Sequence, residues 1–160
     1  LAGQGSGDTV RGGDGDDTVE GGGGTNFLFG NRGSDVVVGG DGSDQVFGGG
    51  GNDVVAAGAG ADFVIGGRGD DLIAGNAPDG AGDKVIDSFL FEAAFGDDVI
   101  TDFEIGFDGI VLAAGIAEED VSTEVVGDDV LVTVDFAGTQ TILVEGVADL
   151  FNPATDIEIG

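Results

Sequence analysis

Hydrophobic and polar positions recur with a period of nine along the first half of the chain. Read in nines from Gly3, the sequence is GQGSGDTVR, GGDGDDTVE, GGGGTNFLF, GNRGSDVVV, GGDGSDQVF, GGGGNDVVA, AGAGADFVI and GGRGDDLIA, ending at Ala74. The eighth position of every unit is aliphatic, whereas glycine and polar residues fill the positions before it. This phase predicts a loop followed by a very short strand with one inward side chain. Because so short a strand is not stable alone, the units must stack and share a core.

The consensus of these units is G-G-x-G-x-D-x-U-x, where U is aliphatic. Glycine at the first, second and fourth positions allows tight turns and positive φ angles that a side chain would block. The sixth position carries a carboxylate in seven units and the amide of Asn26 in the third, beside carbonyls that the glycine loops expose. The candidate metal ligands at the sixth position are Asp8, Asp17, Asn26, Asp35, Asp44, Asp53, Asp62 and Asp71, with Asp83 in one further unit after an insertion. The loop glycines around them are Gly12, Gly13, Gly15, Gly21, Gly22, Gly24, Gly30, Gly33, Gly39, Gly40, Gly42, Gly48, Gly49, Gly51, Gly58, Gly60, Gly66, Gly67 and Gly69.

Charge and composition restrict what this array can bind. The chain carries 32 Asp and Glu against four Arg and Lys, a net charge of −28, and it has neither Cys nor His. So acidic a chain repels nucleic acids and anionic membrane surfaces. No apolar run approaches the ~18 residues of a membrane span. Because only oxygen ligands remain, the sequence predicts binding of a hard cation. The negative charge and the lack of a long apolar run predict no nucleic-acid partner and no direct membrane insertion.

The nonapeptides resemble the RTX (repeats-in-toxin) calcium-binding family, which has the same signature. The resemblance implies a right-handed parallel β-roll in which two units make one turn, so that loops two units apart share a calcium ion. It implies about five to seven Ca²⁺ in all. One edge is expected to pair Asp17 with Asp35, Asp35 with Asp53, and Asp53 with Asp71; the other pairs Asp8 with Asn26, Asn26 with Asp44, Asp44 with Asp62, and Asp62 with Asp83. The two Asn26 sites are expected to be weaker because an amide brings no charge.

The pattern changes after Gly75, and 26 of the 35 glycines precede residue 81. Alternating apolar residues predict strands at 99–103, 130–136 and 141–145, the last two as a hairpin, and single helical turns are expected at 116–121 and 147–151. The segment DDVITDFEIGFDGIVL, residues 97–112, resembles the D-x-I-x-D-F-x-x-G-x-D-x-I-x-L segment that follows RTX arrays. This resemblance implies a cap for the roll, and it leaves open whether Asp102 and Asp108 bind a further ion. The prediction is an all-β chain: a β-roll of about nine nonapeptides over 1–86, capped by a small C-terminal β subdomain over 87–160.

The family resemblance also carries expectations about location and partners. In RTX proteins the C-terminal end is read by a type I secretion machine, and residues 148–160 would occupy that place. The implied setting is a bacterial protein that is secreted, extracellular or on the cell surface. Leu1 falls inside the repeat pattern, so an upstream domain of the same protein is expected. The absence of His excludes H-E-x-x-H zinc sites and Ser-His-Asp triads, and no G-x-S-x-G occurs, so no catalytic residue is predicted in this fragment.

Side chains that flank the inward aliphatic residue should face away from the core. From the third unit on they are apolar, and rows of this size are rare on soluble monomers. We expect residues 84–160, with Phe89, Phe91 and Phe95, to cover the row of one sheet. The leading hypothesis is a calcium-dependent folding and type I secretion module. The alternative is a surface-assembly element, as in adhesins or S-layer proteins, which self-associates through these faces. The two rows are Phe27, Phe29, Phe47, Phe63 and Ile65 on one sheet, and Val36, Val38, Val54, Leu72 and Ala74 on the other.

Overall fold

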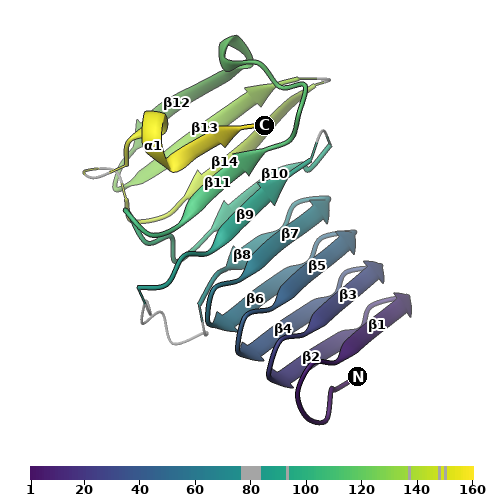
Figure 1. The fold of residues 1–160 in the computed structure, drawn as a ribbon. Helices are drawn as coiled ribbons and strands as arrows, with labels where there is room; N and C mark the ends of the chain where they lie inside the picture. Colours follow the sequence, from purple (N-terminus) through teal and green to yellow (C-terminus); the bar gives the residue numbers. More distant parts are fainter. Residues whose placement is uncertain (77–83, 93, 137, 148, 150) are drawn as a thin grey trace.

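The computed structural model describes residues 1–76, 84–92, 94–136, 138–147, 149 and 151–160, and its elements are almost all strands. The repeat region forms eight strands, one for each nonapeptide. Figure 1 shows them stacked in two layers that rise from the N-terminus toward the C-terminal part. These strands are β1 (Thr9–Asp14), β2 (Thr18–Gly23), β3 (Phe27–Arg32), β4 (Val36–Asp41), β5 (Gln45–Gly50), β6 (Val54–Ala59), β7 (Phe63–Arg68) and β8 (Leu72–Ala74).

Consecutive units alternate between the two sheets. One sheet has the order β1-β3-β5-β7 and the other contains β8-β6-β4-β2, with every repeat strand parallel to its neighbours. Thr9 lies opposite Phe27 and Thr18 opposite Val36, so equivalent residues of successive turns are stacked. The predicted all-β parallel roll, with two units in each turn, is therefore confirmed.

The eighth-position side chains form the core between the sheets. Seven of them are at most 1% exposed, whereas Val10 in the first unit is only partly buried. Burial of each such side chain contributes roughly 1.5–3 kcal/mol, which offsets the entropy of ordering a glycine-rich loop. The seven buried residues are Val19, Leu28, Val37, Val46, Val55, Val64 and Ile73.

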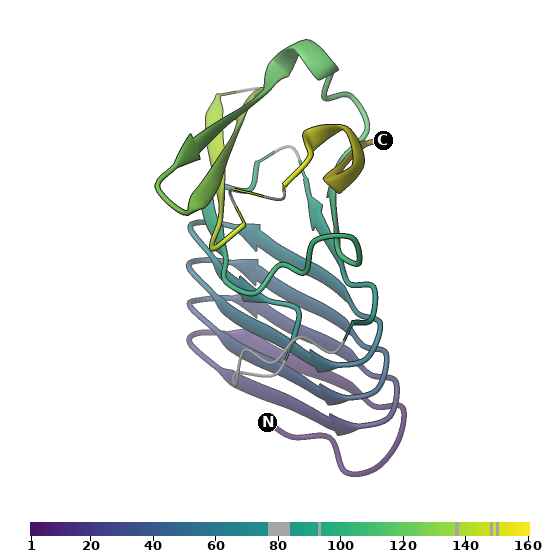
Figure 2. The same cartoon turned by 90° about the vertical axis from the view of Figure 1, so that its left-hand side faces the viewer.

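The C-terminal half continues both sheets. β9 pairs with β7, and β10 pairs with β8, so neither sheet is interrupted near residue 86. Figure 2 shows the later strands standing on the end of the roll, with the antiparallel β12–β13–β14 group on one side and β15 on the other. The division into independent parts at residue 86 stays a prediction. The later elements are β9 (Ser88–Phe91), β10 (Asp97–Ile100), β11 (Gly109–Leu112), η1 (Glu118–Asp120), β12 (Val121–Val126), β13 (Asp129–Asp135), β14 (Thr139–Val144), α1 (Pro153–Asp156) and β15 (Ile157–Ile159).

Most of the predicted C-terminal elements form. The hairpin expected from 130–136 and 141–145 is β13 with β14, and the helical turn expected at 116–121 contains η1. The strand expected at 99–103 ends at Ile100, because the chain leaves the sheet for a loop in which Phe103 turns into the core. The short helix α1 was not predicted. Asn152 caps it by accepting a hydrogen bond from the Ala154 amide.

The expectation that residues 84–160 cover the outer apolar row is wrong. Phe89, Phe91 and Phe95 are at most 1% exposed and belong to the core, because β9 extends the roll instead of folding over its face. On the outer face, Phe27 is 40% exposed. Phe29 and Phe47 stack at 4.7 Å between ring centroids, so the rings of successive turns shelter one another.

Candidate metal centre

The sixth-position side chains lie one above another along each edge of the roll. On the first edge, the backbone N–H of Asp17 donates to Oδ1 of Asp35 at 2.7 Å, Asp35 donates to Asp53 at 2.7 Å, and Asp53 donates to Asp71 at 2.8 Å. We call this row, with Asp98 at its end, the aspartate edge. It brings together four of the predicted ligands in the predicted order.

The second edge is built in the same way. Asp8 donates its N–H to Oδ1 of Asn26 at 2.9 Å, Asn26 to Asp44 at 2.7 Å, and Asp44 to Asp62 at 2.7 Å. The next amide, of Asp62, donates to Asp87 at 2.9 Å. We call this row the asparagine edge. Asp83 lies outside the described residues, and the position stacked on Asp62 is held by Asp87.

Each carboxylate uses only one oxygen in this ladder. The second oxygen, Oδ2, is buried in Asp35, Asp44, Asp53 and Asp71, and it meets no hydrogen-bond donor within the described part of the chain. These residues are at most 2% exposed. A buried charge without a partner is strongly unfavourable, so each Oδ2 needs either an ion of opposite charge or a proton beside it.

The first-position glycines show what surrounds these oxygens. A Cβ added to Gly12 would lie 2.6 Å from the Gly30 carbonyl oxygen and 2.9 Å from Oδ2 of Asp17. At Gly48 the corresponding distances are 2.5 Å to the Gly66 carbonyl and 2.6 Å to Oδ2 of Asp53. At Gly12 and Gly48, carbonyl and carboxylate oxygens therefore converge where only glycine leaves room. This donor set suits calcium, which takes six to eight oxygen ligands.

The second- and fourth-position glycines have a different role. Gly49 and Gly51 have φ angles of +124° and +128°, and an added Cβ would collide with the carbonyl of Asn31 or Gly33 in the previous turn. Positive φ is thus used at these two positions, whereas the first-position glycines are required for space. The predicted loop glycines with positive φ are Gly13, Gly15, Gly22, Gly24, Gly33, Gly40, Gly42, Gly49, Gly51, Gly58, Gly60, Gly67 and Gly69.

Carboxylates alone do not complete a site. Among the described residues, no group of three or more His, Cys, Asp or Glu side chains is placed to hold an ion. Each pair of stacked loops offers two carboxylates, so loop carbonyls must supply the other ligands, as the glycine contacts indicate. The geometry fits shared sites between loops and does not resemble a compact acidic cluster.

Comparison with known proteins agrees with this geometry. The family model of the RTX calcium-binding nonapeptide repeat matches residues 2–37, 20–55 and 38–73. The repeat region of this chain belongs to the RTX calcium-binding family. The RTX repeats bind calcium, and repeats of this kind are typical of secreted proteins. A comparison with curated protein sequences gave no match.

Two solved structures are similar to the chain. The crystal structure of the extracellular lipase LipA from Serratia marcescens is 18% identical, with a TM-score of 0.45, and the match covers 98% of this chain and 40% of LipA. The solution structure of the AlgE6R3 subunit from the Azotobacter vinelandii mannuronan C5-epimerase is 22% identical, with a TM-score of 0.47, covering 90% of this chain and 78% of that subunit. This chain thus spans less than half the length of that lipase.

Burial changes the acidity of the RTX ladder. Loss of solvation, opposed by a backbone hydrogen bond and reinforced by neighbouring carboxylates, raises the pKa of Asp53 to about 6, that of Asp71 to about 7 and that of Asp98 to about 8. On the asparagine edge, burial raises the pKa of Asp44, although hydrogen bonds from Asn26 act in the opposite direction. The protein thus disfavours the charged carboxylates unless a cation compensates them.

Asn26 alters this arrangement on its own edge. Its Oδ1 already accepts the Asp8 amide, so its Nδ2 occupies the place of the second carboxylate oxygen. That nitrogen donates to the Gly24 carbonyl at 3.0 Å and to Oδ1 of Asp44 at 3.1 Å. The sequence predicted a weaker oxygen ligand here. The structure places a hydrogen-bond donor where the other RTX units place an acceptor.

The ladder extends past the last RTX unit, which sequence reasoning missed. Asp71 donates to Asp98 at 2.8 Å, and Asp87 donates to Asp108 at 3.0 Å. Asp102 is not in either row, because its oxygens accept the amides of Gly75 and Asn76. The available sequence signal was the pair Asp97-Asp98 after Gly96, which repeats the second half of an RTX unit.

Proposed function

We propose that this chain is a calcium-triggered folding module. The observation that carries the proposal is the row of buried Oδ2 atoms on the aspartate edge, for which the described residues provide no donor. Without a cation, each turn of the roll buries charge that water would otherwise solvate, so the unfolded chain is favoured. With calcium, binding free energy becomes folding free energy.

The overall charge acts in the same direction. A net charge of −28 opposes any compact state. The glycine residues of the loops also lose more conformational freedom on folding than other residues do. Seven Ca²⁺ would add 14 positive charges and reduce the net charge to about −14. Neutralisation along the loops therefore supports folding as well as local ligation.

The setting that suits such a module is export followed by folding outside the cell. Calcium sites of extracellular modules work at roughly 10⁻⁴–10⁻³ M, far above the roughly 10⁻⁷–10⁻⁵ M range of cytosolic sensors. A chain of this affinity class stays unfolded before export and folds after it. Our proposal therefore includes the type I secretion machinery and an upstream domain as partners, an extracellular or cell-surface location, and no catalytic role for these 160 residues.

Within the described ranges, the structure has no helix that is long and apolar enough to cross a membrane.

A surface-assembly role is the second candidate, because the described residues leave the outer rows partly exposed. On the second sheet Val36, Val54 and Leu72 are 40–44% exposed and stand in one row. Sedimentation of the calcium-loaded chain separates the two roles. A monomer supports the folding module, whereas polymers that Val54→Ser dissociates favour assembly.

The folding proposal is tested by circular dichroism with and without calcium. We expect a disordered repeat region in chelator, a β spectrum in millimolar Ca²⁺, and little effect of Mg²⁺, which demands octahedral geometry and retains its waters. Asp53→Asn should raise the calcium midpoint, whereas Asp41→Asn, which removes an exposed charge from a neighbouring loop, serves as the matched control. Equal β content with and without calcium would refute the proposal.

A further inference from the structure

The aspartate edge does not end with the last RTX unit. We infer that Asp71 and Asp98 hold a further calcium ion, outside the nonapeptides and at the junction with the C-terminal strands. The inference rests on the proposed calcium ladder and adds a site that the repeat pattern does not contain. The family match ends at residue 73.

The loop before β10 reproduces the second half of an RTX loop. Gly96 has a φ of +111°, close to the +113° of Gly69. A Cβ added to Gly96 would collide with the Gly69 carbonyl, and in the same way a Cβ added to Gly69 would collide with the Gly51 carbonyl. The Gly69 amide donates to the Phe95 carbonyl at 2.9 Å, as the Gly51 amide donates to the Arg68 carbonyl at 2.8 Å. The backbone around Asp98 is thus placed as in a genuine repeat.

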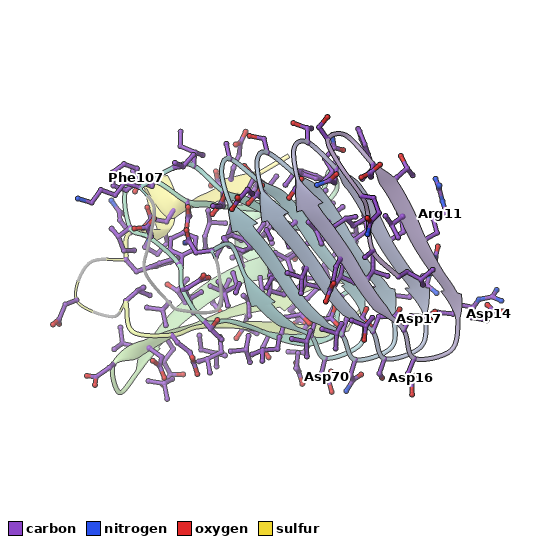
Figure 3. The ribbon with its side chains drawn as sticks, turned by 90° about the horizontal axis from the view of Figure 1, so that it is seen from below. Arg11, Asp14, Asp16, Asp17, Asp70 and Phe107 are labelled. Carbon is purple, nitrogen blue, oxygen red and sulfur yellow. The ribbon has the colours of Figure 1, made fainter. Side chains whose placement is uncertain are left out.

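The flanking positions match as well. The Val99 amide donates to the Asp71 carbonyl at 2.9 Å, just as Leu72 donates to Asp53 one turn earlier. On the outside of the loops, Asp97 donates to Oδ1 of Asp70 at 3.1 Å, in the manner of earlier fifth-position residues. Figure 3 shows Asp16 and Asp70 projecting outward from the loops at one side of the roll. The fifth and sixth positions therefore keep separate roles through residue 98.

The side-chain oxygens show that this junction needs a cation. Asp71 and Asp98 are 2% and 1% exposed, and the Oδ2 atom of each is buried without a donor from any described residue. Asp108 differs, although it also follows the repeats. Its Oδ1 accepts the Asp87 amide at 3.0 Å and its Oδ2 accepts the Glu104 amide at 2.8 Å. Backbone donors thus satisfy Asp108, whereas Asp98 has an unsatisfied oxygen beside that of Asp71.

Two departures explain why the site is absent from the sequence pattern. Phe91 and Glu92 stand where an RTX unit has its first two glycines, and two additional residues lengthen the unit before Phe95. The first half-loop therefore loses the signature, while the second half, Gly96 to Val99, keeps it. The three atoms nearest to a Cβ added at Gly66 belong to Asp71 and Ile73 and include no carbonyl oxygen, whereas those at Gly48 include the Gly66 carbonyl. This ion is therefore expected to bind more weakly than the ions between complete repeats.

The location gives the ion a structural role. β10 pairs with β8 of the RTX region and, on its other side, with β14 of the C-terminal group. The hydroxyl of Thr141 in β14 donates to Oδ1 of Asp97 in β10 at 2.7 Å, and this hydrogen bond joins the two strands next to the ion. Calcium at Asp71 and Asp98 therefore couples the C-terminal sheet to the filled roll.

The test is the number of calcium ions bound by the whole chain, measured by native mass spectrometry across a calcium titration. Asp98→Asn should bind one ion fewer than the unchanged chain, and Asp108→Asn should bind the same number. Asparagine can occupy this kind of position, since Asn26 accepts a ladder amide in the same way. An Asp98→Asn chain that folds and keeps the full number of ions overturns the inference.

A second measurement uses the unchanged chain and does not depend on a variant folding. Anomalous scattering from calcium-loaded crystals should show an ion between Asp71 and Asp98. Ions between the earlier loops with none at this position would contradict this inference and leave the proposed function intact. A chain that takes up no calcium at all would contradict both.

Discussion

The two edges of the roll share one backbone and differ in one side chain. On the aspartate edge, every stacked position from Asp17 to Asp98 is a carboxylate. On the asparagine edge, Asn26 interrupts the row and gives a proton donor to Asp44. The difference shows that the amide removes one buried oxygen that would need a positive partner, whereas Oδ2 of Asp8 and of Asp44 on the same edge still meets no donor among the described residues.

The two edges also differ in how strongly their folding should depend on calcium. Asn26 itself is fully hydrogen-bonded without metal, because its Oδ1 accepts the Asp8 amide and its Nδ2 donates to the Gly24 carbonyl, whereas Oδ2 of Asp53 meets no donor among the described residues. The position of Asn26 should therefore depend less on calcium than the positions of the aspartate edge, while Asp8 and Asp44 keep a calcium requirement on the asparagine edge as well. The following experiments test this division, from the largest expected effect to the smallest.

The largest effect is expected from Asp53→Ala. This side chain stands between two neighbours on the aspartate edge, accepts the Asp35 amide and faces two shared sites. In saturating calcium we expect a loss of about 3 kcal/mol in unfolding free energy, as for other broken buried charge pairs. Urea unfolding followed by circular dichroism measures it. Asp8→Ala, which shares one rung with Asn26, is the comparison and should lose less than half as much.

Low pH should partly replace calcium. Burial raises the pKa of Asp53, Asp71 and Asp98 to about 6, 7 and 8, above the value of 3.8 for an exposed Asp. Between the exposed value and the raised values, the folded chain binds more protons than the unfolded chain. The protonated carboxylates therefore add to the stability of the folded state fully below about pH 4, and this stabilisation is lost as pH rises through about 6 to 8. Calcium-free protein should resist urea better at pH 4.5 than at pH 8.5. The opposite order would show that these carboxylates are not buried without calcium.

Asn26→Asp should have opposite effects with and without calcium. It removes the donor to Gly24 and Asp44, which should destabilise the calcium-free state by about 1–2 kcal/mol. With calcium it completes the row and should lower the calcium midpoint. Titrations in parallel with the unchanged chain measure both. A variant that binds calcium more weakly would show that this position does not face an ion site.

The smallest effect is expected on the outer face. Phe47 stacks on Phe29 at 4.7 Å and meets Phe63 edge-on at 6.3 Å, so Phe47→Ser should cost about 1 kcal/mol. The number of bound calcium ions should not change, because no ladder residue is touched. A change in that number would mean that the sheet face and the loop edges are not independent.

The sequence by itself determined the repeat architecture. Glycine, aspartate and aliphatic residues recur in step, so the local turn, the stacked carboxylate and the buried core predict the same period, and this agreement specified a stacked array of loops and short strands. The resemblance of the repeats to the RTX family then implied the parallel roll and the order of the rows. The sequence also sufficed for the β13–β14 hairpin, because alternation over seven residues is a local signal.

Only the tertiary structure decided where the rows end and which groups face the ions. Asp87 and Asp98 join the ladder because β9 and β10 pair with β7 and β8, and pairing tolerates inserted residues that break a nine-residue count. The amide of Asn26 is oriented by the Asp8 N–H in the preceding turn, a contact that no local pattern contains. Phe89 points inward because its strand extends the sheet, since apolar composition alone does not tell a core strand from a covering one.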